Sequence, residues 1–189
     1  DRQNTLSILN AVREVIQGLK LRHPHLLLDI GCGNGLLDIP LSACCSHVFG
    51  VERVPELVAL AKANTSQILN ISIDIGDGVK LPFPAQSFHR VLAYGVIQLM
   101  TEAETQTMLG EIHRTLKPGG RAFIGSVPYL PLREHYLERY LKEVADAPYL
   151  NAEQRQRIVD RNLAATWYDP SRFTLWWDER FSDGSHRMV

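Results

Sequence analysis

The sequence predicts an α/β fold, a doubly wound, mostly parallel sheet with helices on both faces. Short apolar segments of strand character alternate with helical patterns along residues 26–127. The turn after the first of these segments is rich in glycine and reads GCGNG. No internal repeat, low-complexity tract or linker interrupts the 189 residues. We therefore expect a single domain over residues 1–189.

The first predicted elements surround the glycine turn. Apolar residues recur at spacings of three and four over 4–20, which predicts an amphipathic helix. Residues 26–30 read as a strand buried in a parallel sheet, and 47–52 as a second strand. Residues 36–45 between them read as a helix. Because Pro40 lies inside that helix, we expect a lost hydrogen bond and a bent axis there.

The same alternation continues along the chain. Helices are predicted at 55–67, with a proline in the first turn, and at 102–116. Strands are predicted at 70–75, at 90–95 and, after a KPGG turn, at 121–127. Five strands joined by helices indicate a parallel sheet.

Composition and charge bear on several function classes. Lysine and arginine total 20 against 21 acidic residues, so no global positive field supports binding to nucleic acid. No stretch approaches the roughly 18 uninterrupted apolar residues of a membrane span. Cys32, Cys44 and Cys45 match neither a disulfide framework nor a zinc site, so we expect no metal and a reducing, cytoplasmic environment. The sequence leaves the oligomeric state open.

The glycine turn is the candidate ligand site. Ligands of open parallel sheets bind beyond the carboxyl ends of the strands, where the strand order reverses. Gly31, Gly33 and Gly35 allow a ligand to rest directly on the backbone, and the amino end of the following helix adds positive potential. The third glycine comes one residue too early for a dinucleotide fingerprint, and the lysine of a P-loop is missing. Asp29 beside the loop favours a ligand that carries an ammonium or sulfonium charge.

These segments also carry a family resemblance. LLLDIGCGNG resembles the first motif of class I S-adenosylmethionine-dependent methyltransferases. VFGVE, GDGVKLPFP, SFHRVLAYGVIQLM and EIHRTLKPGGRAFIGSVP follow in the order of that family. The resemblance covers roughly residues 25–130. It implies a Rossmann-like methyltransferase fold with S-adenosylmethionine as cofactor and S-adenosylhomocysteine as product.

The resemblance implies roles for individual residues. Glu52 matches the acid that holds the two ribose hydroxyls, and Asp77 matches the residue that contacts the adenine amino group. Tyr94 falls near the methyl donor. The expected cofactor-binding residues are Asp29, Gly31, Cys32, Gly33, Gly35, Glu52, Arg53, Asp77, Gly78, Ala93 and Tyr94. The catalytic residue is left unknown.

Plain structural roles stay open for the same residues. The glycines suit any tight strand-to-helix turn, Glu52 suits a solvated surface, Asp77 can hold its own Asp-Gly turn, and Tyr94 can lie in the core or at its rim. His89 departs from the resembled family, which commonly has aspartate at this position. We expect that change to alter local hydrogen bonding more than activity.

The resemblance divides the domain into an N-terminal helix (1–20), a cofactor-binding core (21–127) and a helical cap with the carboxyl-terminal segment (128–189). The last part contains polar helical segments at 132–146 and 151–165. An aromatic cluster follows, which we expect to pack in the core and cap and also to supply the acceptor-side wall: Trp167, Tyr168, Phe173, Trp176 and Trp177. Family members usually continue into two further strands, so we expect the chain to be truncated at its carboxyl end.

The expected activity is methyl transfer from S-adenosylmethionine to a small-molecule or glycan acceptor, because the sequence offers no basic face and only a modest cap. YGVIQLM and IGSVP are similar to methyltransferases linked with surface-polysaccharide biosynthesis, which points to a sugar. We expect no nucleic-acid or membrane partner. Two alternatives stay open, a nucleotide-dependent oxidoreductase, which the early third glycine disfavours, and a non-catalytic S-adenosylmethionine-binding protein.

Overall fold

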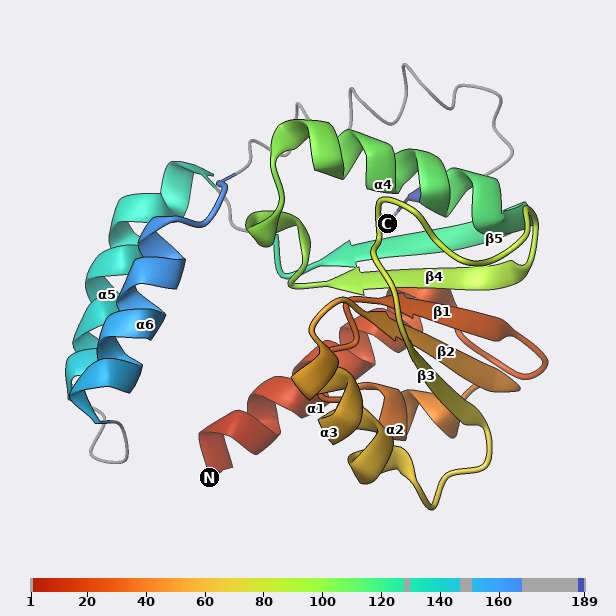
Figure 1. Cartoon of the computed structure of the whole chain (residues 1–189), viewed down its shortest axis with the longest axis horizontal. Coiled ribbons are helices and arrows are strands. Elements are labelled where there is room, and N and C mark those ends of the chain that lie inside the picture. The colour runs from red at the N-terminus through yellow and green to blue at the C-terminus, as the bar shows by residue number, and fades with distance from the viewer. Residues whose placement is uncertain (1, 128–129, 147–150, 168–186, 189) are drawn as a thin grey trace.

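The structure is a computed structural model that describes residues 2–127, 130–146, 151–167 and 187–188. Its centre is a six-stranded sheet in the order β3-β2-β1-β4-β5-β6, and every pair of neighbours is parallel (Figure 1). The strands are β1 (Leu26–Ile30), β2 (His47–Glu52), β3 (Ile71–Ile75), β4 (Phe88–Tyr94), β5 (Leu116–Gly125) and β6 (Arg187–Met188). The predicted α/β class with a parallel sheet is confirmed.

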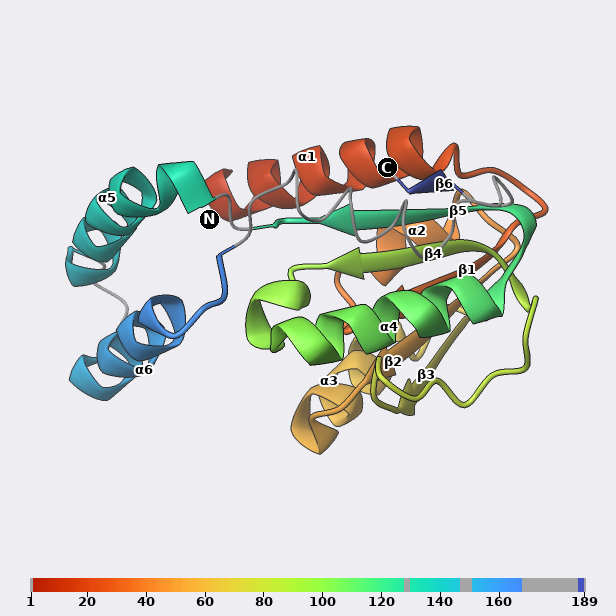
Figure 2. The ribbon, with the colours of Figure 1, turned by 90° about the horizontal axis from the view of Figure 1, so that it is seen from above.

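Helices cover both faces of the sheet. Helices α1 (Arg2–Leu19), α2 (Asp38–Ser42) and α3 (Pro55–Thr65) pack on one face, and α4 (Glu102–Thr115) packs on the other. Figure 2 shows α1 and α4 on opposite sides of the strands. Because side chains alternate along a strand, Leu27 meets α1 and α2 while Leu28 meets α4. Each strand at the centre of the sheet is therefore apolar on both faces.

The strand order reverses beside β1. The chain winds from β1 outward to β2 and β3, then returns to form β4 on the other side of β1. The connections that leave the carboxyl ends of β1 and β4 therefore run in opposite directions, one toward β2 and the other toward β5. This arrangement creates the crevice in which open parallel sheets bind ligands.

Helix α2 is shorter than predicted. It begins at Asp38, two residues later than expected, and contains five residues. Pro40 consequently lies in the first turn, where backbone N–H groups have no intrahelical acceptor, so the predicted loss of an interior hydrogen bond was wrong. A helix of one turn also adds little of the positive potential expected at the glycine loop.

Strand β5 begins earlier than predicted and the sheet has one strand more. Residues of KPGG belong to β5, whose pairing with β4 is irregular because Phe88 faces Leu116 and Arg90 faces Arg121. Three short elements had no sequence signal, the 3₁₀ helices η1 (Ile97–Leu99) and η2 (Leu130–Leu132), and β6. The expectation of five strands was therefore short by one.

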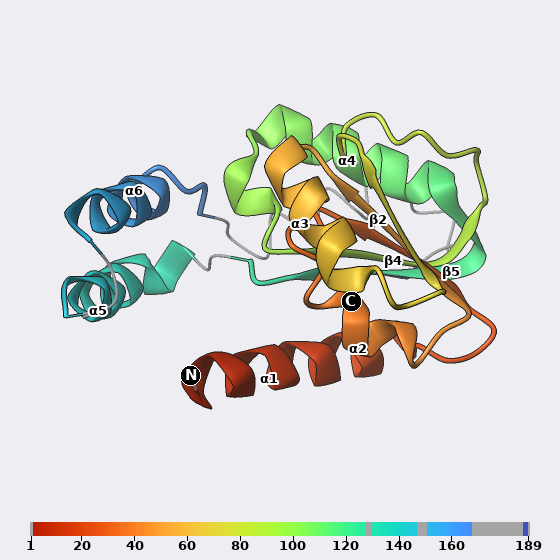
Figure 3. The ribbon, with the colours of Figure 1, turned by 60° about the horizontal axis from the view of Figure 1, so that its bottom comes forward.

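Two helices form a hairpin beyond the carboxyl end of β5. Helices α5 (Arg133–Ala145) and α6 (Ala152–Leu163) lie side by side and project away from the sheet (Figures 1 and 3). The helical segments predicted at 132–146 and 151–165 are confirmed. The chain returns at Thr166, whose amide donates to the Gln98 carbonyl and whose hydroxyl donates to the Met100 carbonyl, each at 3.0 Å. Tyr168, Phe173, Trp176 and Trp177 lie outside the described residues.

Candidate functional site

A cleft of about 490 Å³ lies at the carboxyl ends of β1, β2, β3 and β4. Four segments that are distant in sequence line it, the glycine loop after β1, the end of β2, residues 76–78 after β3, and residues 94–96 at the end of β4. Helix α1 adds Ile8 to the wall. The cleft therefore lies at the point where the strand order reverses.

The cleft brings together most of the cofactor-binding residues that the sequence predicted. Those that line it are Asp29, Gly31, Cys32, Gly33, Glu52, Arg53, Asp77, Gly78 and Tyr94. Gly35 and Ala93 do not line the cleft. A Cβ on Gly35 would lie 3.3 Å from the Cβ of Ala61, so Gly35 permits the loop to pack on α3. Ala93 is fully buried in the core on the α4 face.

The loop glycines serve different purposes. Gly31 and Gly33 both have positive φ angles, +72° and +58°, which favour glycine. A Cβ on Gly31 would lie 2.6 Å from Cγ2 of Val96, so close packing requires glycine there. A Cβ on Gly33 would meet nothing within 4 Å. Because Gly33 lines the cleft, its bare backbone leaves room for a ligand.

Glu52 is fixed in place at the end of β2. Its side chain accepts the amide of Gly33 at Oε2 (3.1 Å) and the amide of Val54 at Oε1 (3.0 Å). The residue is 8% exposed and lines the cleft. A carboxylate oxygen can accept more than one hydrogen bond, so both oxygens retain capacity for a ligand hydroxyl. Glu52 thus presents two acceptors in a fixed orientation.

Asp77 and Gly78 line the cleft from the turn after β3. Asp77 is exposed, and its Oδ1 accepts the amide of Val79 at 3.1 Å. Asp77 therefore stabilises its own turn as well as lining the cleft. A Cβ on Gly78 would lie 2.8 Å from Cγ2 of Ile30, so this glycine allows the turn to approach β1 closely.

A buried pair of carboxyl groups lies beneath the loop. Asp29 (2% exposed) lines the cleft, and Asp38 (fully buried) interacts with it from the start of α2. Among the described residues, no group is placed to hydrogen-bond in standard geometry to Oδ1 of Asp29 or to either carboxyl oxygen of Asp38. Burial, with the charges of Asp38 and Glu52, raises the pKa of Asp29 well above its ordinary value. Burial raises the pKa of Asp38 to about 7. The pair therefore holds a proton near neutral pH.

Asp38 escaped the sequence-based search for site residues. The sequence spacing places Asp38 on the buried face of the helix, because Leu41 and Cys45, three and seven residues later, are both fully buried. An acid on the apolar stripe of a short helix has to find a polar partner or a ligand. The nearby Asp29 is that partner.

The remaining wall of the cleft is largely apolar. Tyr94 forms part of it, and the apolar residues that line it are Ile8, Ile30, Leu36, Leu37, Val51, Val54, Leu57, Val96, Leu99 and Met100. Burial, with the charge of Glu14, raises the pKa of the Tyr94 phenol, so Tyr94 stays protonated at neutral pH. Ile8 could not be assigned from sequence because a helix that precedes the core gives no sign of which strand end it reaches.

Two other properties bear on function. Among the described residues, no group of three histidine, cysteine, aspartate or glutamate side chains is placed to hold a metal ion. Of the described helices, none combines the length and apolarity that crossing a bilayer would require.

Known proteins share this fold and these motifs. The "Methyltransferase domain" family model matches residues 27–120. A "2-phytyl-1,4-naphtoquinone methyltransferase" of Synechococcus elongatus is 33% identical over 152 residues, which cover 74% of this chain and 63% of that protein. A "Ubiquinone biosynthesis O-methyltransferase" of Coxiella burnetii is 28% identical over 178 residues, which cover 93% of this chain and 71% of the relative.

A solved structure extends the likeness to the arrangement in space. The YcgJ protein of Bacillus subtilis matches 90% of this chain and 67% of its own with a TM-score of 0.69 at 19% identity. At that identity the likeness concerns the fold alone. The chain spans 63% of the length of the Synechococcus relative. The matched residues 27–120 form the glycine loop and most of the cleft, so this chain has the fold and the cleft of class I S-adenosylmethionine-dependent methyltransferases, the family that it resembles.

Proposed function

We propose that this chain transfers the methyl group of S-adenosylmethionine to a small acceptor with an apolar, aromatic body. The observation that carries the proposal is the pairing of Gly33, open to the cleft, with Glu52, whose carboxylate is fixed toward the same space. A nucleoside that lies on bare backbone needs both the room and a double acceptor for its vicinal hydroxyls.

The residues of the cleft fit the cofactor along its length. Glu52 would accept the two ribose hydroxyls, and Asp77 would accept the adenine amino group. Asp29, buried with an unpaired oxygen, would face the ammonium group at the amino-acid end. Three acids around one cleft favour a cationic ligand, because each attracts positive charge in a partly desolvated site. The same acids would repel a negatively charged pyrophosphate.

The apolar wall supports an aromatic acceptor more than a glycan. A sugar presents many hydroxyl groups, and each loses hydrogen bonds with water unless the protein replaces them. Tyr94, Val96 and Leu99 offer mainly contact area instead. The names of the relatives refer to quinone compounds, which have a flat ring with an apolar chain. We therefore favour a phenolic or quinol acceptor over the sugar expected from two short motifs.

The chemistry asks little of a catalytic base. When bound, S-adenosylmethionine supplies a methyl group that its sulfonium already activates. The chain then has to hold the acceptor in line with that group and keep water out, and the apolar wall suits both tasks. Tyr94 is protonated at neutral pH, so it serves as a wall or a hydrogen-bond donor rather than as a base.

Calorimetric titration with S-adenosylhomocysteine tests the cofactor, with NADH and NADPH as comparison ligands. We expect saturable binding of the thioether nucleoside alone. Binding of a nicotinamide cofactor in its place would overturn the proposal and favour the oxidoreductase alternative.

Mass spectrometry with isotope-labelled S-adenosylmethionine tests the reaction. The acceptor panel contains catechols, short-chain quinols, simple sugars and a control without acceptor. We expect label in a phenolic product. Label in sugars alone would contradict the acceptor assignment, and cofactor binding without any transfer would favour the non-catalytic alternative.

A further inference from the structure

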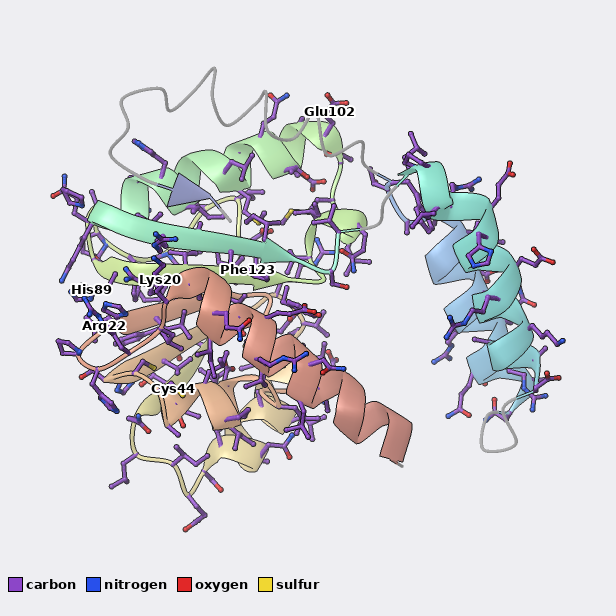
Figure 4. The ribbon with its side chains drawn as sticks, turned by 180° about the vertical axis from the view of Figure 1, so that it is seen from behind. Lys20, Arg22, Cys44, His89, Glu102 and Phe123 are labelled. Atoms are coloured by element: carbon purple, nitrogen blue, oxygen red, sulfur yellow. The ribbon has the colours of Figure 1, made fainter. Side chains whose placement is uncertain are left out.

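A cluster of basic side chains lies at the opposite edge of the sheet from the cleft, where the strands begin. We call it the amino-edge cluster and define it as Arg22, His25, His89, Arg90, Lys117 and Arg121. These residues come from the segment before β1, the start of β4 and the start of β5. Figure 4 shows Arg22, His89 and the neighbouring Lys20 gathered at one edge, remote from the α5–α6 hairpin.

Two histidine rings in the cluster are held by backbone amides. The ring centroids of His25 and His89 lie 5.6 Å apart, with 23° between the planes. The amide of Leu26 donates to Nδ1 of His89 at 3.0 Å, and the amide of Arg22 donates to Nδ1 of His25 at 3.3 Å. A neutral imidazole whose Nδ1 accepts carries its proton on Nε2. Both rings therefore present Nε2–H as a donor.

One of these donors faces another donor. Nε2 of His89 lies 3.4 Å from Nζ of Lys117. Because Nδ1 of His89 already accepts from Leu26, Nε2 has no lone pair to offer the ammonium group. An oxygen that accepts from both groups would satisfy each of them. The His89 Nε2–H group and the Lys117 ammonium group thus lack a shared acceptor between them.

The electrostatics of the cluster have a single sign. Burial, followed by the charges of Arg121 and Arg22, lowers the pKa of Arg90. Burial, followed by Arg90, His89 and Arg22, lowers the pKa of His25 to about 4. Burial, followed by Lys117 and Arg90, lowers the pKa of His89. Each cation in the cluster therefore disfavours the protonated, positively charged form of its neighbours.

The described surroundings provide no carboxylate to offset these charges. The segments that form this edge, 20–25, 43–47, 86–90 and 116–121, contain no aspartate or glutamate. Nε of Arg90 donates to the carbonyl of Leu19 and its Nη1 donates to the carbonyl of His89, so its partners are neutral.

We propose that the amino-edge cluster binds the phosphate group of a ligand. Phosphate oxygens would accept from His89 Nε2–H and the Lys117 ammonium group, while Arg22, Arg90 and Arg121 offset the negative charge. A phosphate carries up to two negative charges and several acceptor oxygens, which suits a cluster of four permanent cations better than a single carboxylate does. The phosphate can belong to a free anion or to a lipid headgroup.

This site is separate from the cofactor cleft. The five residues of β1 run from one to the other, a length of about 16 Å at the rise of a parallel strand. The proposal therefore does not depend on the methyl-transfer function. Either proposal can fail while the other holds.

Inorganic pyrophosphate titrated into the full chain provides the test. Long-range ¹H–¹⁵N spectra of the histidine side chains report the tautomers, and calorimetry reports affinity. We expect the free protein to show Nε2–H for His25 and His89, and the His89 signals to move saturably with pyrophosphate. A His89 signal that does not move would overturn the proposal.

Variants separate a built site from general charge. Lys117→Gln removes one charge-assisted hydrogen bond, so pyrophosphate affinity should fall about tenfold. Lys142→Gln removes the same charge from exposed α5 and should change the affinity less than about twofold. His89→Asp supplies an internal acid, so it should abolish pyrophosphate binding and raise the thermal midpoint in phosphate-free buffer. Equal losses for Lys117→Gln and Lys142→Gln would overturn the proposal.

Vesicles distinguish the two sources of phosphate. Co-sedimentation with phosphatidylcholine vesicles is compared with and without phosphatidylglycerol. Binding that requires phosphatidylglycerol and is lost in Lys117→Gln supports a headgroup. Pyrophosphate binding without vesicle binding supports a soluble phosphorylated ligand. If neither pyrophosphate nor the vesicles bind, the proposal is overturned. It is also overturned if the chain binds an oligonucleotide that pyrophosphate does not displace.

Discussion

The backbone amide of Gly33 donates a 3.1 Å hydrogen bond to Oε2 of Glu52, nineteen residues further along the chain. This bond ties the loop after β1 to the end of β2 before any ligand arrives. The same carboxylate also accepts the amide of Val54 and therefore cannot rotate freely. A single acid thus shapes the loop and presents two acceptors to the cleft.

Glu52→Gln tests this arrangement. The amide side chain keeps the size of glutamate but loses the charge and one acceptor position, so the ribose hydroxyls and the Gly33 amide compete for fewer lone pairs. We expect affinity for S-adenosylhomocysteine to fall about 10- to 100-fold by calorimetry. Glu56→Gln, on an exposed position of α3, is the matched control. Comparable affinities of the two variants would contradict the role of Glu52.

Gly33→Ala tests the open backbone of the loop. Gly119 is a matched control, since its φ is +73° and a Cβ there would also meet nothing within 4 Å. Alanine at either position should cost about 1 kcal/mol of unfolding free energy through the left-handed backbone. Only Gly33→Ala places a methyl group in the cleft. We expect a loss of S-adenosylhomocysteine affinity of at least about tenfold for Gly33→Ala alone, whereas equal affinities would argue against ligand contact at this loop.

Asp38→Asn should change how stability depends on pH. The folded pKa of Asp38 is about 7, above its ordinary value of 3.8, so this carboxyl group favours folding at acid pH and loses that contribution as pH rises through 7. Asparagine cannot ionise and can donate to Asp29. At pH 8 we expect the free energy of unfolding of the variant to be higher than that of the wild type by on the order of a few kcal/mol. We also expect the free energy of unfolding of the variant to change less with pH.

Urea denaturation of both proteins between pH 5 and pH 8 measures this difference. His25 acts in the opposite direction, because its folded pKa of about 4 removes stability as pH falls below its ordinary value of 6.5. That contribution is common to the wild type and Asp38→Asn, so it cancels in the comparison. Parallel profiles would show that Asp38 does not titrate in this range.

Arg114→Ala should loosen the segment that connects β3 to β4. Arg114 donates to both carboxylate oxygens of Glu111 (2.7 and 2.8 Å) and to the carbonyl of Phe83 (2.7 Å). Loss of this network should lower the unfolding free energy by about 2 kcal/mol in urea. Arg157→Ala breaks an exposed pair with Glu153 and should cost less than about 0.5 kcal/mol. Similar losses for the two variants would refute the network.

Two strands could be predicted to the residue. The bounds of β1 and β2, 26–30 and 47–52, agree with the structure because mostly apolar runs are buried on both faces and end at polar or glycine residues. The central strand β4 was predicted at 90–95 but begins at Phe88 and ends at Tyr94. The start of β5 could not be predicted, since KPGG has the composition of a turn and pairs with β4 only through an irregular register. Tertiary pairing overrides local preference there.

The residues of the candidate site also divide into those that the sequence could predict and those that it could not. Glycines and acids at strand ends were predictable because the sheet topology carries each of them to one edge. Gly35 was predicted for the ligand but packs on α3, because spacing alone does not separate a glycine needed for packing from one that faces a cleft. Asp38 and Ile8 were missed, since their contribution depends on how α2 and α1 lie against the strands.

The strand order has a consequence for how the protein unfolds. The glycine loop and Glu52 belong to the half of the sheet that contains β1 to β3, whereas Tyr94 and Gly95 belong to the half that begins with β4. Both halves meet along the seam between β1 and β4, and a molecule in the cleft contacts each side of it. Cofactor binding should therefore make the two halves melt as one cooperative unit, with a sharper thermal transition than that of the free protein.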